Sequence, residues 1–270
     1  MLRLVKREAR VRDELFGVRT VKNELQTAVN VFTHPDGRTV TIVGIEHLGT
    51  PEYFAQLRKV VDELEAAGAS VRLETFQGQD NADAARDQAE LEALRRLHDS
   101  IASRFNAWSE LGLSWIGQRD SVMSTAPSWT HSDVADIDLV RVLGPEYHPA
   151  SGKELQSKIE WIRQRNATYG LALLRYLEGW KQVRRGDDVQ KDKHHVDWWA
   201  KQVISSWREC VELTKVLGQE GDTVLIWGAP HMKGLSQGLL RNGFELVDTQ
   251  WFTACTAPRL WWRPSTRGQK

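Results

Sequence analysis

The sequence predicts an α/β fold in which both ends of the chain form a mainly parallel sheet and a large helical insertion lies between them. Two apolar, β-branched runs, residues 40–43 and 223–227, are typical of buried strands, and each is followed by a glycine. Each glycine precedes a helical stretch, a closing glycine and a second strand-like run. We therefore expect one α/β domain over residues 1–270, with the sheet platform in residues 24–80 and 218–258 and the insertion in residues 81–217.

Length and charge limit the classes of function. The chain has 270 residues, enough for a sizeable core, and its 36 basic residues balance 36 acidic ones. No overall field favours nucleic acid or an anionic membrane surface. No stretch reaches the roughly 20 apolar residues of a membrane span, and the two cysteines form no CxxC motif. We expect a soluble, cytoplasmic protein with a peptide or small-molecule substrate, and no prediction is made for its oligomeric state.

The first half of the platform shows strong local signals. Residues 28–32 and 38–43 flank a His-Pro-Asp-Gly turn, which predicts a β-hairpin. Thr50-Pro51 is a typical helix start, apolar residues then recur at helical spacing, and Gly68 ends the helix. Residues 69–76 read as a strand. Together these elements predict a parallel βαβ unit with a right-handed crossover.

The middle of the chain is helical and rich in tryptophan. Helical patterns cover residues 81–105, 132–143, 152–183 and 193–217, and residues 109–128 suit a loop or lid. Eight of the twelve tryptophans lie between Trp108 and Trp207. These rings either pack helices together or line a groove for an apolar or peptide-like ligand. The groove interpretation expects some of the following to be partly exposed beside the site: Trp108, Trp115, Trp129, Trp198 and Trp199. The tail, residues 264–270, is expected to be disordered.

Two GxxH motifs supply the candidate chemistry. Gly44-Ile-Glu-His47 and Gly228-Ala-Pro-His231 each follow a predicted buried strand. The glycine would permit a sharp turn, which presents the histidine at the carboxyl edge of the sheet, where open α/β folds bind ligands. The spacing alone would arise by chance in roughly one such chain in ten, given glycine at about 7% of residues. Most of the evidence for a shared site therefore comes from the strand–helix–strand context that is repeated around the two motifs.

Glu74 is the third candidate, because it lies near the carboxyl end of the strand expected beside the His47 strand. A carboxylate there needs a cation, a metal ion or hydrogen-bond donors. Two imidazoles and a carboxylate suit a catalytic divalent metal, with zinc favoured and manganese or iron as alternatives. The same three groups without a metal would place His47 as a base and Glu74 as its orienting group. A plain salt bridge between Glu74 and an arginine is the structural alternative.

These residues resemble the TraB/PrgY–Tiki–GumN family, which has paired GxxH motifs at opposite ends of an α/β platform with a helical middle. The resemblance follows motif order over residues 39–252 and is closest at the second motif, with its trailing Gly234-Leu235 and Gly243-Phe244. More distant relatives in fold include erythromycin esterases and haem-binding ChaN-like proteins. The resemblance implies a metal-dependent, peptidase-like hydrolase with His47, Glu74 and His231 at the metal. It also implies a mid-chain polar residue facing the site, either Arg165 or Asn166.

The chain departs from that pattern in its first motif, where Ile45-Glu46 replaces small residues and adds a carboxylate. Glu46 and Asp133 are secondary candidates, although Ser132 or Asp133 also suits a helix N-cap. Members of the Tiki type are exported or membrane-anchored, and this chain shows neither signal. Three functions therefore stand side by side: a metal-dependent hydrolase, a metal-free esterase-like hydrolase, and a non-catalytic haem- or peptide-binding module.

Overall fold

The computed structural model places most of the platform and much of the helical middle. It describes residues 14–46, 49–74, 84–110, 126–144, 152–165, 170–171, 173–174, 176–178 and 196–257, except the side chains of 105, 108 and 196–202. His47, Asn166 and Trp115 lie outside the described residues, as does the predicted tail.

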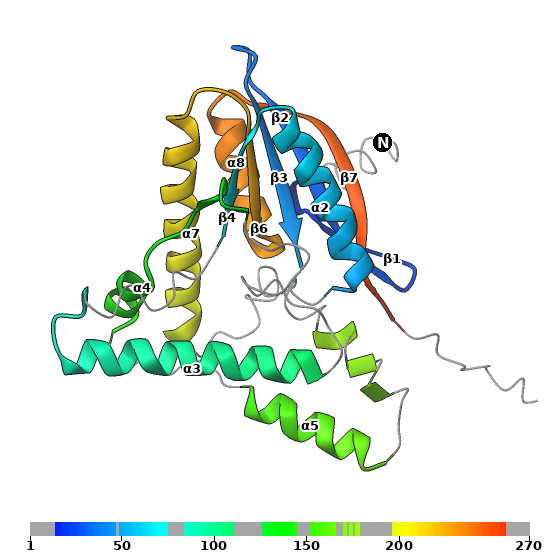
Figure 1. The fold of residues 1–270 in the computed structure, drawn as a ribbon, viewed down its shortest axis with the longest axis vertical. Helices are drawn as coiled ribbons and strands as arrows, with labels where there is room; N and C mark the ends of the chain where they lie inside the picture. The colour runs from blue at the N-terminus through cyan, green and yellow to red at the C-terminus, as the bar shows by residue number, and fades with distance from the viewer. Residues whose placement is uncertain are drawn as a thin grey trace, which may run out of the picture.

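A seven-stranded mixed sheet has the strand order β1-β2-β3-β6-β4-β5, with β7 paired to β2. It lies in the upper part of the view in Figure 1, above α3 (Gln88–Glu110) and α5 (Lys153–Arg163). The four strands β3, β6, β4 and β5 are parallel, and β2 is antiparallel to β1, β3 and β7. This confirms the predicted α/β class. The strands are β1 Val18–Val21, β2 Glu24–Thr33, β3 Thr39–Ile45, β4 Ser70–Leu73, β5 Thr130–His131, β6 Thr223–Gly228 and β7 Glu245–Thr256.

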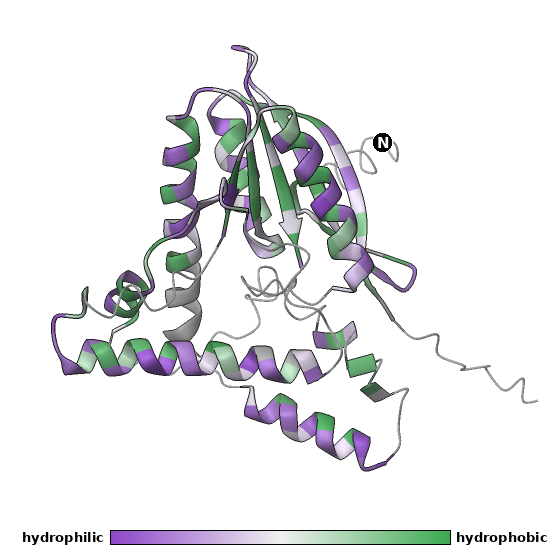
Figure 2. Cartoon of the chain, in the orientation of Figure 1, coloured by the Kyte–Doolittle hydropathy of each residue, from purple (hydrophilic) through white to green (hydrophobic). Residues whose placement is uncertain are grey.

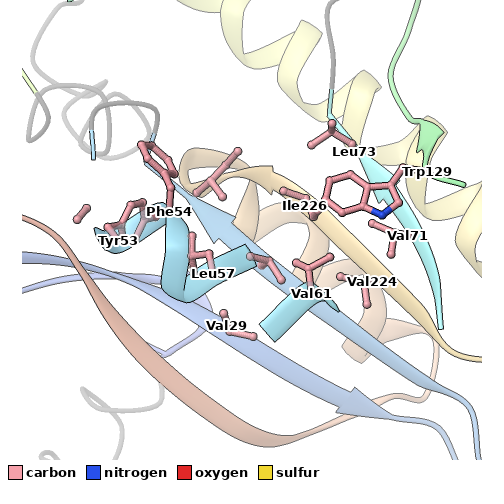
Figure 3. Packing of buried hydrophobic residues seen from close by; sticks show 13 residues of the cluster. Val29, Tyr53, Phe54, Leu57, Val61, Val71, Leu73, Trp129, Val224 and Ile226 are labelled. Atoms are coloured by element: carbon pink, nitrogen blue, oxygen red, sulfur yellow. The ribbon is translucent and has the colours of Figure 1, made fainter. Parts of the chain in front are cut away.

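Helices cover both faces of this sheet. The buried strand β6 alternates its side chains, so Val224 and Ile226 pack with α2 (Pro51–Ala66) on one face (Figure 3). Leu225 and Trp227 point to the other face, where α7 (Val196–Leu217) and α8 (Met232–Arg241) lie. The region expected to be an insertion therefore contributes α7 directly to the core of the platform.

The predicted hairpin and the first helix are confirmed. β2 and β3 pair antiparallel across the His-Pro-Asp-Gly turn. Thr50 caps α2 by accepting a hydrogen bond from the backbone N–H of Tyr53, and Pro51 occupies the first turn. Gly68 follows the helix at φ +101°, a left-handed conformation that glycine adopts without strain.

The strand order corrects one prediction. β4 does not neighbour β3, because β6 from the far end of the chain lies between them and pairs in parallel with both. The strand after α8 also differs from its counterpart after α2: β7 runs antiparallel along β2 at the opposite side of the sheet. The two GxxH units are therefore alike in sequence but not in their place in the sheet.

The glycines of the two motifs do not make sharp turns. Gly44 lies inside β3, and Gly228 ends β6 with φ −53° and ψ 134°. Gly44 is needed for close packing, since a Cβ added there would lie 1.9 Å from Sδ of Met232. Gly228 contributes its backbone N–H to the site described below.

Three further helices extend beyond the sheet (Figure 1). They are α3 (Gln88–Glu110), α4 (Asp136–Leu143) and α5 (Lys153–Arg163), and in Figure 2 α3 and α5 alternate between hydrophilic and hydrophobic residues along their length. A separate apolar cluster joins α3 to α4 through Leu94, Leu97 and Val140. No helix within the described ranges is long and apolar enough to cross a membrane.

Candidate functional site

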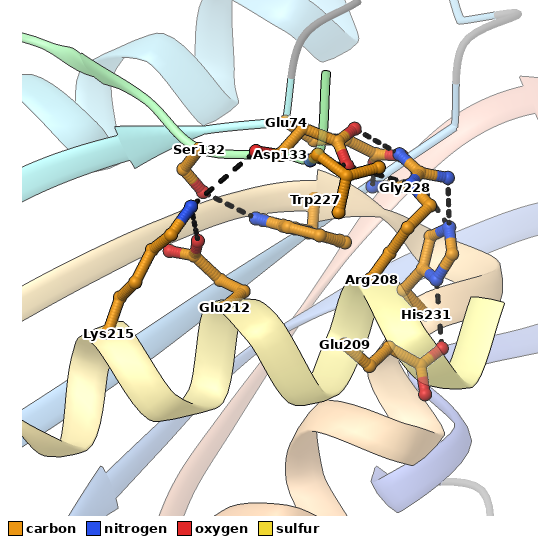
Figure 4. Close-up of polar contacts among 11 residues, drawn as sticks. Glu74, Ser132, Asp133, Arg208, Glu209, Glu212, Lys215, Trp227, Gly228 and His231 are labelled. Atoms are coloured by element: carbon orange, nitrogen blue, oxygen red, sulfur yellow. Dashed lines mark hydrogen bonds and ion pairs between the residues drawn. The ribbon is translucent and has the colours of Figure 1, made fainter. Parts of the chain in front are cut away.

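The polar side chains gather at the carboxyl edge of the parallel strands. Glu46 follows β3, Glu74 follows β4, Asp133 follows β5 shortly after its last residue, and His231 follows β6. Among the predicted residues, the structure brings together Glu74, His231 and Asp133, as Figure 4 shows. These residues thus lie together at the carboxyl edge of the parallel strands, where open α/β folds bind ligands.

Arg208 lies at the centre of this group (Figure 4). It projects from α7 and donates from Nη2 to Glu74 Oε1 at 2.5 Å and from Nε to Asp133 Oδ1 at 2.8 Å. Its Nη2 also donates to the second oxygen of Asp133, which makes that pair bidentate. The guanidinium therefore forms ion pairs with carboxylates from two different strand ends.

Burial makes this ion cluster strongly coupled. The side chain of Arg208 is 10% exposed, that of Glu74 9% and that of Asp133 1%. Burial alone would lower the pKa of Arg208, but the charges of Glu74 and Asp133 outweigh it, and the net pKa is raised. Burial raises the pKa of Asp133, against the hydrogen bonds and charge of Arg208. The buried guanidinium opposes this rise, because it favours the ionised form of the carboxyl groups that it contacts.

Glu74 is held on both sides. Its Oε2 accepts the backbone N–H of Gly228 at 2.5 Å, while its own backbone N–H donates to Ile226. The first contact places the carboxylate over the end of β6, directly before His231. Glu74 Oε1 lies 3.5 Å from His231 Nε2.

His231 is contacted at both ring nitrogens by neighbouring residues of α7. Nδ1 lies 2.8 Å from Glu209 Oε1, and Nε2 lies 3.2 Å from Nη1 of Arg208. The edge of the imidazole meets the buried ring of Trp227, with the centroids 5.2 Å apart. The side chain is 10% exposed. The histidine of the second GxxH motif is thus clamped from three directions.

Asp133 is part of this cluster and is not a helix cap. The helix α4 begins at Asp136 with Ala135 as its N-cap, so the N-cap interpretation of Ser132 or Asp133 is wrong. Ser132 instead accepts a hydrogen bond from the indole N–H of Trp227 at 3.1 Å. The contact of Ser132 with Trp227 joins the end of β5 to β6, and the contact of Asp133 with Arg208 joins it to α7.

Glu46 is completely buried at the end of β3. Its backbone N–H donates to the hydroxyl of Tyr53 at 2.9 Å, and its charge contributes to raising the pKa of the nearby Cys255 thiol. His47 follows it in sequence but lies outside the described residues, so the placement of the first histidine stays a prediction.

Two of the candidate residues lie away from the site, whereas the alternatives predicted alongside them lie outside the described residues. Arg165 is exposed at the end of α5, where it donates to the carbonyl of Trp161 at 3.2 Å and stacks on its ring at 4.0 Å. The site guanidinium comes from Arg208, on a different helix. Trp129 is 5% exposed in the core under α2, and its indole N–H donates to Glu65, so it lines no groove. The side chains of Trp108, Trp198 and Trp199 lie outside the description.

Sequence reasoning missed Arg208 and Glu209. They lie in a helix whose charges are typical of a solvated face, but the run Ser-Trp-Arg-Glu-Cys places the pair beside apolar helix positions. The interruption of a helical apolar stripe by an arginine is the one local signal that could have singled them out.

Comparisons with protein-family models, with curated proteins and with solved structures find no match. The resemblance to the TraB/PrgY–Tiki–GumN family therefore stays a prediction. Among the residues that the structure describes, no group of three or more His, Cys, Asp and Glu side chains could hold a metal ion.

Proposed function

We propose that the chain is a hydrolase that activates water at this edge of the sheet for attack on an ester or amide carbonyl, with Arg208 in place of a metal ion. The observation that carries this proposal is the contact of one guanidinium with Glu74, Asp133 and His231 at once. A metal ion shared by these donors would have to displace that guanidinium. An arginine is a permanent cation, so its charge stays beside the carboxylates across the physiological pH range.

The described residues supply the parts that water activation needs. His231 offers Nε2 as a base, and Glu74 lies 3.5 Å from that atom as a second acceptor for a water molecule. Nε and Nη2 of Arg208 hold Asp133, which leaves Nη1, the nitrogen beside His231 Nε2, as a fixed donor for a developing oxyanion. His47, which the resemblance places in the same site, is a candidate for the second base.

A metal-dependent, peptidase-like hydrolase is the second candidate, and one observation favours it. The Nδ1 of His231 faces a carboxylate, as is usual for histidines that bind a metal through Nε2. In that case His231 and Glu74, with His47, would hold zinc, manganese or iron, and the ion would supply an activated water.

The test uses the purified chain with p-nitrophenyl acetate and a mixed peptide library. We expect His231→Asn to lower kcat by about 100-fold or more, the usual contribution of a general base. The matched control is His34→Asn, because His34 is a half-buried histidine in the hairpin turn at the opposite end of β3, and it should leave kcat unchanged.

Chelation separates the two candidates. Activity that survives prolonged chelation, with no stoichiometric metal by elemental analysis, supports the arginine-centred hydrolase. Activity that is lost on chelation and restored by zinc or manganese supports the metal-dependent one. Binding of peptide or haem without turnover of any ester or amide would overturn both and favour the binding module.

A further inference from the structure

The environment of His231 defines which ring nitrogen carries the proton. Arginine has only donors, so an Nη1 that lies 3.2 Å from Nε2 requires a lone pair on Nε2. The carboxylate of Glu209 has only acceptors when ionised, so its Oε1 at 2.8 Å from Nδ1 requires a proton on Nδ1. Glu74 Oε1, an acceptor, also faces Nε2, but at 3.5 Å it is farther away than the Arg208 donor at 3.2 Å. The nearest partner of each ring nitrogen therefore selects the same neutral tautomer.

These two partners are consecutive residues of one helix. Arg208 and Glu209 leave α7 in directions that differ by about 100°, as neighbours on a helix do, and so reach opposite sides of the imidazole (Figure 4). His231 is placed between them because Pro230 and the short 3-10 turn Ala229–His231 hold it directly before α8. The positions of α7 and α8 relative to each other thus determine the contact.

A glycine of α8 makes room for Glu209. A Cβ added to Gly234 would lie 1.7 Å from Oε2 of Glu209 and 2.4 Å from its carboxyl carbon. One turn later, a Cβ on Gly238 would lie 2.1 Å from Cδ1 of Leu213 on α7. Both glycines let the two helices approach closely, but only Gly234 adjoins the carboxylate that contacts His231.

We infer that Glu209 is a positioning residue that keeps the proton of His231 on Nδ1, and that Gly234 provides the space in which it does so. Nε2 is then the unprotonated ring nitrogen that can accept a proton. When a substrate or a water molecule replaces Arg208 as the partner of Nε2, Glu209 is the remaining group that keeps the proton on Nδ1. The consequence for catalysis rests on the proposed function, whereas the tautomer does not.

The tautomer is measured by ¹⁵N NMR of the ring nitrogens at a pH at which His231 is neutral, with its signals assigned by their absence in His231→Asn. We expect a protonated Nδ1 and an unprotonated Nε2. A ring with its proton mainly on Nε2 would overturn the inference, whatever the activity of the protein.

Two glycine variants of α8 distinguish a positioning role of Glu209 from a general effect of helix packing. Gly234→Ala should displace Glu209 and give a mixture of tautomers, whereas Gly238→Ala, which disturbs only Leu213, should keep the wild-type ring signals. If Gly234→Ala does not fold, Glu209→Ala replaces it in the same comparison. Equal ring signals in wild type and in both Gly234→Ala and Glu209→Ala would overturn the role of Glu209.

The kinetic test uses p-nitrophenyl acetate. Glu209→Ala should lower kcat by about 10- to 100-fold with little change in KM, the usual effect of removing the partner of a functional histidine. Glu209→Gln should recover part of that loss, because its amide oxygen can still accept a hydrogen bond from the Nδ1–H group. A wild-type protein with the expected tautomer but no turnover would refute the proposed function and leave the tautomer assignment intact.

Discussion

At the scale of single residues, the charge of the site depends on Arg208. Two carboxylates from different strand ends, Glu74 and Asp133, are nearly inaccessible to water and face the same guanidinium. Taking such charges out of water costs several kcal/mol per ion, and this cost is offset only while the partner is present. The arginine therefore determines both the stability of this edge and the ionisation of its acids.

Arg208→Met should destabilise the protein by about 3–5 kcal/mol at pH 7, because it leaves two buried carboxylates without their cation. Burial already raises the folded-state pKa of Asp133. Without the guanidinium that pKa would rise further, and the pKa of the buried Glu74 would rise with it. The lost stability should then be partly regained as the pH falls toward about 4, where the unfolded carboxyls also take up protons.

Urea unfolding of this variant at pH 7 and at pH 4.5 measures the loss of stability and the direction in which that loss changes with pH. Arg165→Met is the matched control, because Arg165 is exposed, and it should change stability by less than about 0.5 kcal/mol. A loss for Arg208→Met that grows on acidification would contradict the burial argument.

How far the sequence predicts the site follows from these residues. Glu74 and His231 could be found because Glu74 lies near the carboxyl end of one predicted strand and His231 lies in the turn after another, and the carboxyl ends of parallel strands share one edge. Arg208 could not be found in this way, because a charged residue in a helix reads as solvated unless the packing of that helix is known. Arg165 was chosen for its place in a motif order, which carries no information about its direction.

At the scale of elements, strand order is the feature that local patterns left undetermined. The runs of β4 and β6 are both short and apolar, so nothing in them indicates that β6 lies between β3 and β4. That order is nevertheless decisive for the site, since it places Gly228 beside Glu74 and brings His231 between two acidic strand ends. The two ends of α2, in contrast, follow from its cap and turn residues, Thr50 and Gly68.

The contact between β3 and α8 gives a prediction at this scale. Gly44→Ala should destabilise the protein by about 1–3 kcal/mol, because its Cβ would lie 1.9 Å from Sδ of Met232 and 3.0 Å from the carbonyl oxygen of Ala28. Thermal or urea unfolding measures the loss.

Two further variants make the assignment specific. Gly218→Ala should be nearly neutral, because its Cβ would meet only ordinary contacts at 3.5 Å and beyond. In a Met232→Ala background, Gly44→Ala should be less harmful than in the wild type, since the clashing sulfur is gone. An equal loss in both backgrounds would show that the glycine serves something other than this contact.

At the scale of the whole molecule, β2 connects the two ends of the chain. Residues early in the sequence pair with β7, near the end of the described chain, along the full length of both strands. Because β1 and β3 share the other edge of β2, loss of β7 would expose one side of the central hairpin. The platform should therefore unfold as one cooperative unit.

The two cysteines report on that cooperativity. Cys255 lies near the end of β7 and is 6% exposed; burial, and then the charge of Glu46, raise the pKa of its thiol to about 12. Cys210 is exposed on α7. At pH 8 we expect a thiol reagent to modify Cys210 rapidly, whereas Cys255 is both inaccessible and almost entirely protonated, so it should react only when β7 leaves the sheet.

The measurement follows labelling in Cys210→Ser, in which Cys255 is the remaining thiol, at increasing urea concentration. Cooperative unfolding predicts that the free energy of opening at Cys255 equals the free energy of global unfolding and decreases with the same dependence on urea. A much smaller value, with little dependence on urea, would mean that β7 detaches alone. The hairpin and β6 would then hold the site without the end of the chain, and the platform would consist of two units with separate stabilities.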